Sequence, residues 1–318
     1  MRDTRYIILV LLSSLLMLTG CSRRELLDDY PVSGVDIKLD WNGVTDKLPE
    51  GVRVIFYPKS AEGRKIDTYL SVRGGKVKVP PGRYSVVAYN YDTETVQIRG
   101  EEAYETIEAF TGYCNGLGIA GTEKMVWGPD PLYVVQINDL HIANSEEELL
   151  LDWKPKLVVK TYSFKIKVEG LEYVSSIVGS VEGMAGCYCL GRCCGMMNDA
   201  PIYFEAQGCS GEVTGSFTAF GLPEGAMSRA SLAIKFTLAF VKVDNTVQKI
   251  EVDITDVIVN SESGEGGGND EPSKDIELPL DDDEVKVDKP ENSSGGDGGI
   301  GGDVGDWGEE EEVPLPVI

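Results

Sequence analysis

The chain has 318 residues with a formal net charge of −24, seven cysteines and one histidine. This length suits two ordinary domains or one large β domain after any leader is removed. The charge argues against nucleic-acid binding, because the chain has no basic stripe that would contact phosphates.

The N-terminus has the layout of a lipoprotein signal peptide. Arg2 and Arg5 precede an apolar run at 7–18, and two small residues separate this run from Cys21. The run is too short for a permanent membrane-spanning helix. The sequence Leu-Thr-Gly-Cys that ends at Cys21 fits the lipobox of bacterial lipoproteins. We therefore predict that residues 1–20 are removed and that Cys21 carries acyl chains such as palmitate.

The residues after Cys21 indicate a destination and a tether. Ser22 stands where an aspartate retains some lipoproteins at an inner membrane, which favours the outer membrane. The acidic residues between 25 and 29 leave open whether the protein faces the periplasm or the cell surface. Residues 21–34 are expected to form a lipid-anchored tether with an extended reach of about 40 Å.

Strand signals dominate the first half of the mature chain. Apolar and polar residues alternate at 35–41, which buries one face of a strand. Shorter strands are predicted at 52–57 and 76–79. A Pro-Gly turn then leads into the run at 79–90, in which both faces are largely apolar, so this strand is expected to be central.

The second half repeats this pattern. Apolar residues alternate from Tyr162 to Val168, and short helical turns are expected at 145–151 and 171–178. Further strands are predicted at 178–190, 200–206, 212–220, 231–243 and 246–256. Many short strands separated by turns predict an all-β fold of two tandem antiparallel β-sandwich domains. Their predicted limits are 35–144 and 155–260.

The C-terminal part, 261–318, differs in composition. It contains 19 acidic residues, three lysines and twelve glycines, which predicts a flexible acidic tail. Apolar islands at 276–280 and 313–318 either form late strands or stay unordered. A single copy of a calcium-binding GGxGxDxU repeat occurs at 298–305, but such repeats need neighbouring copies.

Several stretches together resemble the fimbrillin-like and fimbrial-anchor lipoproteins of Bacteroidales. They are the lipobox, "VPPGRYSVVAYNYDTETV" (79–96), "KTYSFKIKVEGLEYVSSIVGSVEGMAG" (160–186) and the end of the chain at 303–318. The resemblance implies transthyretin-like, Greek-key sandwiches and a role in anchoring, capping or starting a pilus. It also implies fimbrial subunits as partners, joined by β-strand addition, and no catalytic residues. The cysteine cluster and the long tail depart from the family pattern.

The cysteine cluster is "CYCLGRCCG" (187–195). If Gly191 and Arg192 form a hairpin turn, Cys189 lies opposite Cys194, where a cross-strand disulfide can form. The alternatives are loop cysteines without a function, or a zinc site that uses the spacing of Cys189 and Cys193.

Catalytic patterns are missing from the sequence. His141 is the only histidine, and no GxSxG, P-loop, HExxH or dinucleotide motif occurs. We therefore expect a protein that is not an enzyme and uses no cofactor. Trp127 lies in a turn and is the best candidate for stacking on a sugar. The rival function is therefore a surface glycan-binding lipoprotein or a tip adhesin.

Overall fold

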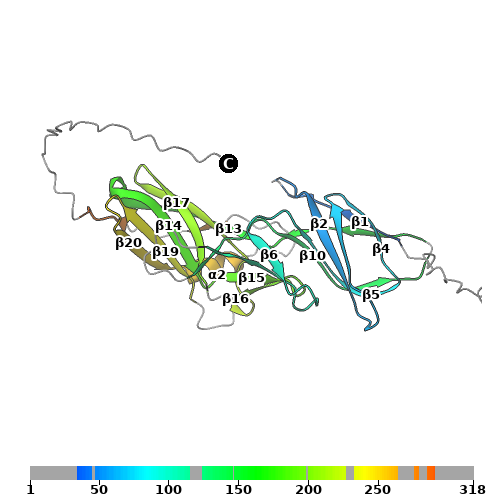
Figure 1. Ribbon diagram of the computed structural model, residues 1–318. Helices are drawn as coiled ribbons and strands as arrows, with labels where there is room; N and C mark the ends of the chain where they lie inside the picture. Colours follow the sequence, from blue (N-terminus) through cyan, green and yellow to red (C-terminus); the bar gives the residue numbers. More distant parts are fainter. Residues whose placement is uncertain are drawn as a thin grey trace, which may run out of the picture.

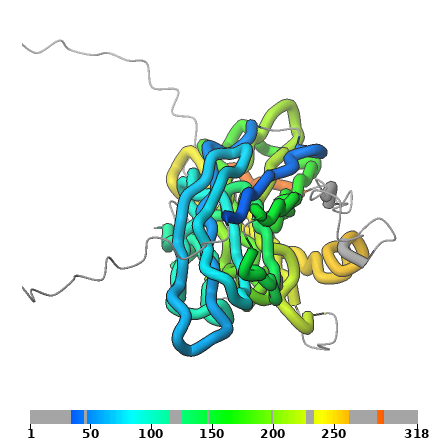
Figure 2. The backbone as a smooth tube through the Cα atoms, turned by 90° about the vertical axis from the view of Figure 1, so that its right-hand side faces the viewer, coloured from blue at the N-terminus to red at the C-terminus, as the bar shows by residue number. Residues whose placement is uncertain are grey.

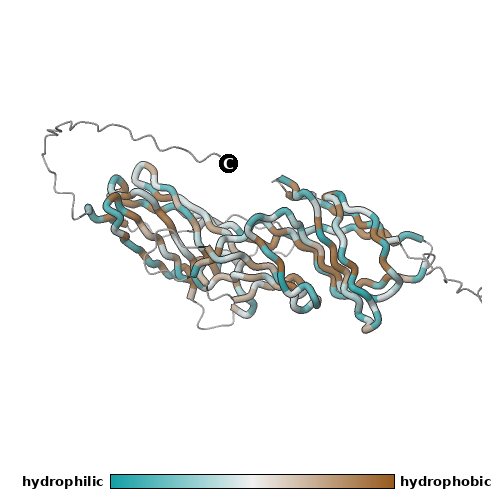
Figure 3. The backbone as a smooth tube through the Cα atoms, viewed as in Figure 1, coloured by the Kyte–Doolittle hydropathy of each residue, from teal (hydrophilic) through white to brown (hydrophobic). Residues whose placement is uncertain are grey.

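The protein folds into two β lobes that lie end to end (Figure 1). The computed structural model describes residues 34–44, 47–114, 124–145, 147–197, 200–226, 233–263, 276–278 and 285–290. An eight-stranded sheet forms the N-lobe, a ten-stranded sheet forms the C-lobe, and a four-stranded sheet joins them. The prediction of an all-β protein with two β domains is confirmed. Apolar residues concentrate along the strands of both lobes, and hydrophilic residues are frequent in the turns (Figure 3).

The N-lobe is a single sheet that folds over on itself. Its strand order is β11-β1-β4-β3-β2-β5-β10-β12. Because β3 and β4 pair only where Ser71 meets Gly74, the sheet turns a corner there. A core of apolar side chains lies between the β11-β1-β4 layer and the β2-β5-β10 layer. The strands are β1 (Gly34–Leu39), β2 (Gly51–Pro58), β3 (Ile66–Ser71), β4 (Gly74–Lys78), β5 (Gly82–Asn90), β10 (Tyr133–Ile142), β11 (Leu149–Trp153) and β12 (Lys156–Leu157).

Strand β5 is central and covered on both faces, as its two-faced apolar pattern predicts. It pairs with β2 on one side and β10 on the other. Val86 and Ala88 face the N-lobe core, whereas Val87 and Tyr89 face a second core toward the C-lobe. Because successive side chains of a strand point to opposite faces, one apolar run serves both cores.

The C-lobe sheet follows the order β20-β19-β14-β17-β18-β13-β21, with β8, β9 and β22 attached beside it. Its core contains a group of contacting aromatic rings that includes Phe164, Phe204 and Phe236. Gly179 makes room for this group, since a β-carbon there would lie 2.1 Å from the Phe204 ring. The strands are β8 (Tyr113–Cys114), β9 (Met125–Trp127), β13 (Lys160–Glu169), β14 (Val174–Glu182), β17 (Ile202–Cys209), β18 (Glu212–Ala219), β19 (Lys235–Lys242), β20 (Val247–Asp253), β21 (Ile276–Leu278) and β22 (Val285–Lys286).

A third sheet, the junction sheet, takes strands from both halves of the chain. It has the order β16-β15-β7-β6, formed by β6 (Val96–Arg99), β7 (Glu108–Thr111), β15 (Ala185–Cys189) and β16 (Cys194–Met197). Strands β8 and β9 also belong to the first half of the chain, yet β9 pairs with β17 of the C-lobe. The chain therefore passes from the N-lobe to the C-lobe, returns for β10 and crosses again before β13. The domain limits predicted from the sequence stay a proposal.

Two segments expected to be helical contain strands. Residues 149–153 form β11, parallel to β1, because Leu149 and Leu151 pack on the N-lobe core. In the other segment a 3₁₀ turn, η1, covers only Leu171–Tyr173 before β14 begins. Within a strand-rich sequence, burial against an existing sheet outweighs weak helical preference.

One helix was not expected. Helix α2 (Thr255–Ser263) follows β20 and lies at the flank of the molecule (Figure 2). The Asp253 carboxylate accepts the Thr255 N–H at 2.9 Å, and Ile254 and Ile258 are buried four residues apart. The capping bond and this spacing favour a helix over the strand that the β-branched residues suggest. No helix in the described part of the chain is long and apolar enough to cross a membrane.

Candidate assembly edges and the lobe junction

The predicted lipid-attachment residue, Cys21, lies outside the described residues, as do the signal peptide and all of the tether before Gly34. Their roles stay predictions. The island at 313–318 and the calcium-type repeat at 298–305 also lie outside the described residues.

The cysteine cluster forms the hairpin that joins the two lobes. Cys189 lies opposite Cys194 in the β15–β16 pair, which is the register expected from the hairpin, and residues 190–193 make the turn. Strand β15 pairs with β7 on its other side. At the tip, the Leu190 N–H donates to the Ile107 carbonyl oxygen at 3.0 Å. The cysteine-rich segment of the sequence therefore lies at the junction.

All six described cysteines carry free thiols, so the Cys189–Cys194 disulfide stays a prediction. The Cys194 thiol lies 3.3 Å from a carboxylate oxygen of Glu224. Burial and this acidic neighbour raise the pKa of Cys194 to about 11. No group of three or more metal-ligating side chains gathers anywhere in the described ranges.

Trp127 lies at the end of β9, paired with Tyr203 of β17, and not in the turn that the sequence suggested; 42% of its surface is exposed. Its ring meets Tyr203 edge to face, with centroids 5.5 Å apart. The indole is therefore partly available to a ligand and partly used in packing the β9–β17 contact. Its suggested role in stacking on a sugar stays a prediction.

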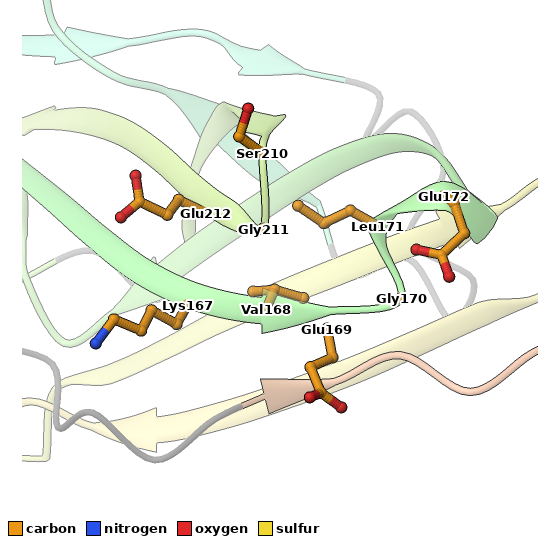
Figure 4. A pocket seen from close by; sticks show the side chains of 9 residues that line it. All are labelled: Lys167, Val168, Glu169, Gly170, Leu171, Glu172, Ser210, Gly211 and Glu212. Carbon is orange, nitrogen blue, oxygen red and sulfur yellow. The ribbon is translucent and has the colours of Figure 1, made fainter.

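A shallow polar pocket of about 430 Å³ lies between two turns of the C-lobe (Figure 4). One wall is the segment 167–172 and the other is 210–212. Val168 and Leu171 lie between the two walls, whereas the Glu169 side chain points away from segment 210–212. No histidine or cysteine lines this pocket, and its charged groups are not arranged as a nucleophile with a base.

One sheet edge of the C-lobe is filled by the chain's own C-terminal part. Strand β21 runs parallel to β13 at Tyr162–Phe164, so part of the apolar island at 276–280 is a late strand. Strand β22 continues the same edge opposite Val168 and Glu169. The next residue, Val287, is 2% exposed and belongs to the C-lobe core, and its N–H donates to the Glu169 carbonyl oxygen at 2.9 Å.

Some other sheet edges have no partner strand among the described residues. Strand β11 pairs only with β1, and β20 pairs only with β19, among the residues that the structure describes. An open edge presents unpaired N–H and C=O groups to which another strand can bind. The sequence pattern did not identify either edge, because pairing partners are set by topology.

Two curled β lobes joined by a small sheet define the class of all-β protein to which this chain belongs. Residues 20–205 match a family described as a domain of unknown function, DUF5119, and the chain belongs to this family. A relative from Bacteroides ovatus, named as a proposed fimbrium anchoring subunit, Fim4B, is 59% identical over 334 residues, which cover 100% of both proteins. The predicted resemblance to fimbrial-anchor proteins is confirmed.

Solved structures give the same architecture. A proposed adhesin from Bacteroides ovatus is 56% identical, with a TM-score of 0.71, and the match covers 86% of this chain and 98% of the other. A second proposed adhesin from Bacteroides ovatus is 10% identical with a TM-score of 0.50, over 77% of this chain and 87% of the other. The second match shows the fold alone.

Proposed function

We propose that the protein is a non-enzymatic lipoprotein of the outer membrane that anchors a fimbria-like surface polymer or takes part in its assembly. The observation that carries this proposal is the full-length identity of 59% to a protein named as a proposed fimbrium anchoring subunit. The fold agrees with such a role, since it offers sheet edges and a four-stranded sheet that connects the two lobes. The described residues contain no arrangement that points to catalysis.

The positions of the two lobes fit attachment through the N-terminus. Strand β1 begins at Gly34, directly after the proposed tether, and β20 lies toward the opposite end of the molecule (Figure 1). A lipid on Cys21 would therefore hold the N-lobe nearest the membrane and let the C-lobe project from it. More than one acyl chain makes such attachment stable.

The proposed partners are fimbrial subunits that bind by β-strand addition. Main-chain hydrogen bonds at a sheet edge provide affinity, and alternate side chains provide specificity. The parallel strand β21 on β13 is an example of this kind of pairing within the chain itself.

The first experiment is a pull-down of tagged full-length protein from detergent-solubilised outer membranes. Partners are identified by mass spectrometry before and after boiling in SDS. We expect a β-rich secreted subunit that is released only on boiling. In the Cys21→Ser variant the protein should leave the detergent phase and the membrane fraction. If the wild type recovers no such subunit under any growth condition, the fimbrial function is wrong.

A rival function is supported by the name of the relative with a solved structure, which is a proposed adhesin. In this case the protein would bind a surface glycan, with Trp127 as the stacking residue. Retention on gels that contain polysaccharide, lost in Trp127→Ala, would favour the adhesin. Tyr113→Ala is a matched control, because Tyr113 lies on the adjoining strand β8 and is also exposed.

A further inference from the structure

The free edge of β11 differs in its side chains from the edge of β20. Strand β11 is bound to β1 along its whole length, from Val35 opposite Leu149 to Leu39 opposite Trp153. No described strand pairs with its other side. The start of β11 is held in place by Glu148, whose carboxylate accepts hydrogen bonds from the Lys76 ammonium at 2.6 and 2.7 Å.

Its apolar side chains are only partly covered. Leu149 and Leu151 pack on the N-lobe core but remain half-buried, because no strand of the described residues lies beyond them. Leu150 points to the opposite face and is 60% exposed. Three successive leucines at an uncovered edge are unusual, since such edges invite pairing with other chains.

The edge of β20, at one end of the C-lobe sheet, has the usual protection. Lys249, Glu251 and Asp253 alternate along it, and all three are exposed. Charged side chains on an edge strand oppose pairing with a further strand, because the pairing would bring those charges into a less hydrated position. Charged side chains therefore protect the β20 edge, whereas the first three residues of β11 are uncharged and its first charged residue is Asp152.

We propose that the outer edge of β11 is the site at which a fimbrial subunit adds a strand, an inference that rests on the proposed function. The row of main-chain N–H and C=O groups selects an extended segment as the occupant. This segment carries uncharged apolar side chains at alternate positions. Those on the inner face cover Leu149 and Leu151, and a neighbour on the outer face packs against Leu150.

The test compares two full-length variants in the pull-down from outer membranes. Leu150→Lys places a charge on the β11 edge without removing any hydrogen bond to β1. Val252→Lys makes the same kind of change at a side chain of β20 that is 41% exposed. We expect Leu150→Lys to reduce the recovered subunit about tenfold or more, which corresponds to about 1.4 kcal/mol of binding free energy. Val252→Lys should recover as much subunit as the wild type.

A second measurement does not depend on a substitution. In the purified wild-type complex, the main-chain amides of Leu149–Trp153 should exchange with deuterium more slowly than in the free protein. Those of β20 should be unchanged. Equal recovery by Leu150→Lys, or unchanged exchange in β11, overturns the assignment of this edge and leaves the fimbrial function standing. If the wild type itself recovers no fimbrial subunit, both proposals are wrong.

Discussion

Gly191 lies directly against the main chain of Tyr104. A β-carbon at position 191 would come within 1.9 Å of the Tyr104 carbonyl oxygen. Gly191 is at the tip of the β15–β16 hairpin, and Tyr104 is in the segment between β6 and β7. The Gly191 carbonyl oxygen also accepts a hydrogen bond from the Gln136 amide at 3.1 Å. The hairpin therefore fits onto the N-lobe side only because this residue has no side chain.

The Gly191→Ala variant should loosen the junction. The added methyl group cannot be accommodated without moving the main chain of Tyr104, and we expect a loss of about 2 kcal/mol in the free energy of unfolding. Urea unfolding measures this loss, and limited proteolysis should cut faster in the residues around the hairpin. Gly112→Ala is the control, since the nearest atom to its β-carbon would be 3.5 Å away. Equal stability of both variants would contradict the close fit.

Asp67→Asn should change how stability depends on pH. The Arg53 guanidinium donates hydrogen bonds to Asp67 at 2.9 and 2.7 Å and holds the pKa of that carboxyl below its usual range. A lowered folded-state pKa contributes stability above the unfolded value, which is lost as pH falls through the folded value. The variant should be less stable at pH 7 by about 0.5 kcal/mol, the size expected of a solvent-screened pair.

The difference between wild type and Asp67→Asn should begin to shrink at about pH 4, where the carboxyl of the unfolded chain takes up a proton, and should disappear once the folded carboxyl is protonated as well. Urea unfolding at pH 7 and pH 3 measures the difference in the free energy of unfolding between the two proteins. A difference that is the same at both values would show that the ion pair with Arg53 does not carry the effect.

Val287→Ala tests whether the late C-terminal segment belongs to the C-lobe core. Removing two buried methyl groups from a side chain that is 2% exposed should lower stability by about 2 kcal/mol. Val243→Ala serves as the control, because Val243 is 62% exposed and its truncation should have little effect. Thermal unfolding compares the two. Should both variants melt at the wild-type temperature, residues 285–290 do not contribute to the folded core.

Glu224→Gln should make the Cys194 thiol more reactive. Glu224 helps to raise the pKa of Cys194 to about 11, so little thiolate is present at pH 8 in the reduced protein. Replacing the carboxylate by an amide lowers that pKa, and alkylation at pH 8 should become severalfold faster. Peptide mapping follows each cysteine separately, with the exposed Cys209 as an internal control. An unchanged rate at Cys194 would show that Glu224 does not contribute to the raised pKa.

Strands with a clear two-residue period could be predicted from the sequence. The alternation from Tyr162 to Val168 lies within β13, and the two-faced run at 79–90 contains the central strand β5. Residues 149–153 could not be assigned in this way, because Leu-Leu-Leu fits a helix as well as an edge strand. Their parallel pairing with β1 is a contact between residues more than 100 positions apart.

The candidate site was harder to foresee than the fold. The hairpin register that puts Cys189 opposite Cys194 follows from local turn geometry and could be predicted. That the same hairpin binds β7 of the preceding half could not, since nothing local to Cys187 specifies Phe110 as its neighbour. Open edges are likewise visible only after every strand has found its partners.

The way the chain crosses between the lobes has a mechanical consequence. The chain runs from the N-lobe to the C-lobe, returns to the N-lobe and enters the C-lobe a second time. In addition, β7 and β15 are joined by main-chain hydrogen bonds. A pull applied between Gly34 and the far end of the C-lobe is therefore shared by several covalent connections and a β ladder. The joint between the lobes therefore does not depend on a single segment of chain. A force on the C-lobe would reach the N-lobe through this joint and not through a single linker.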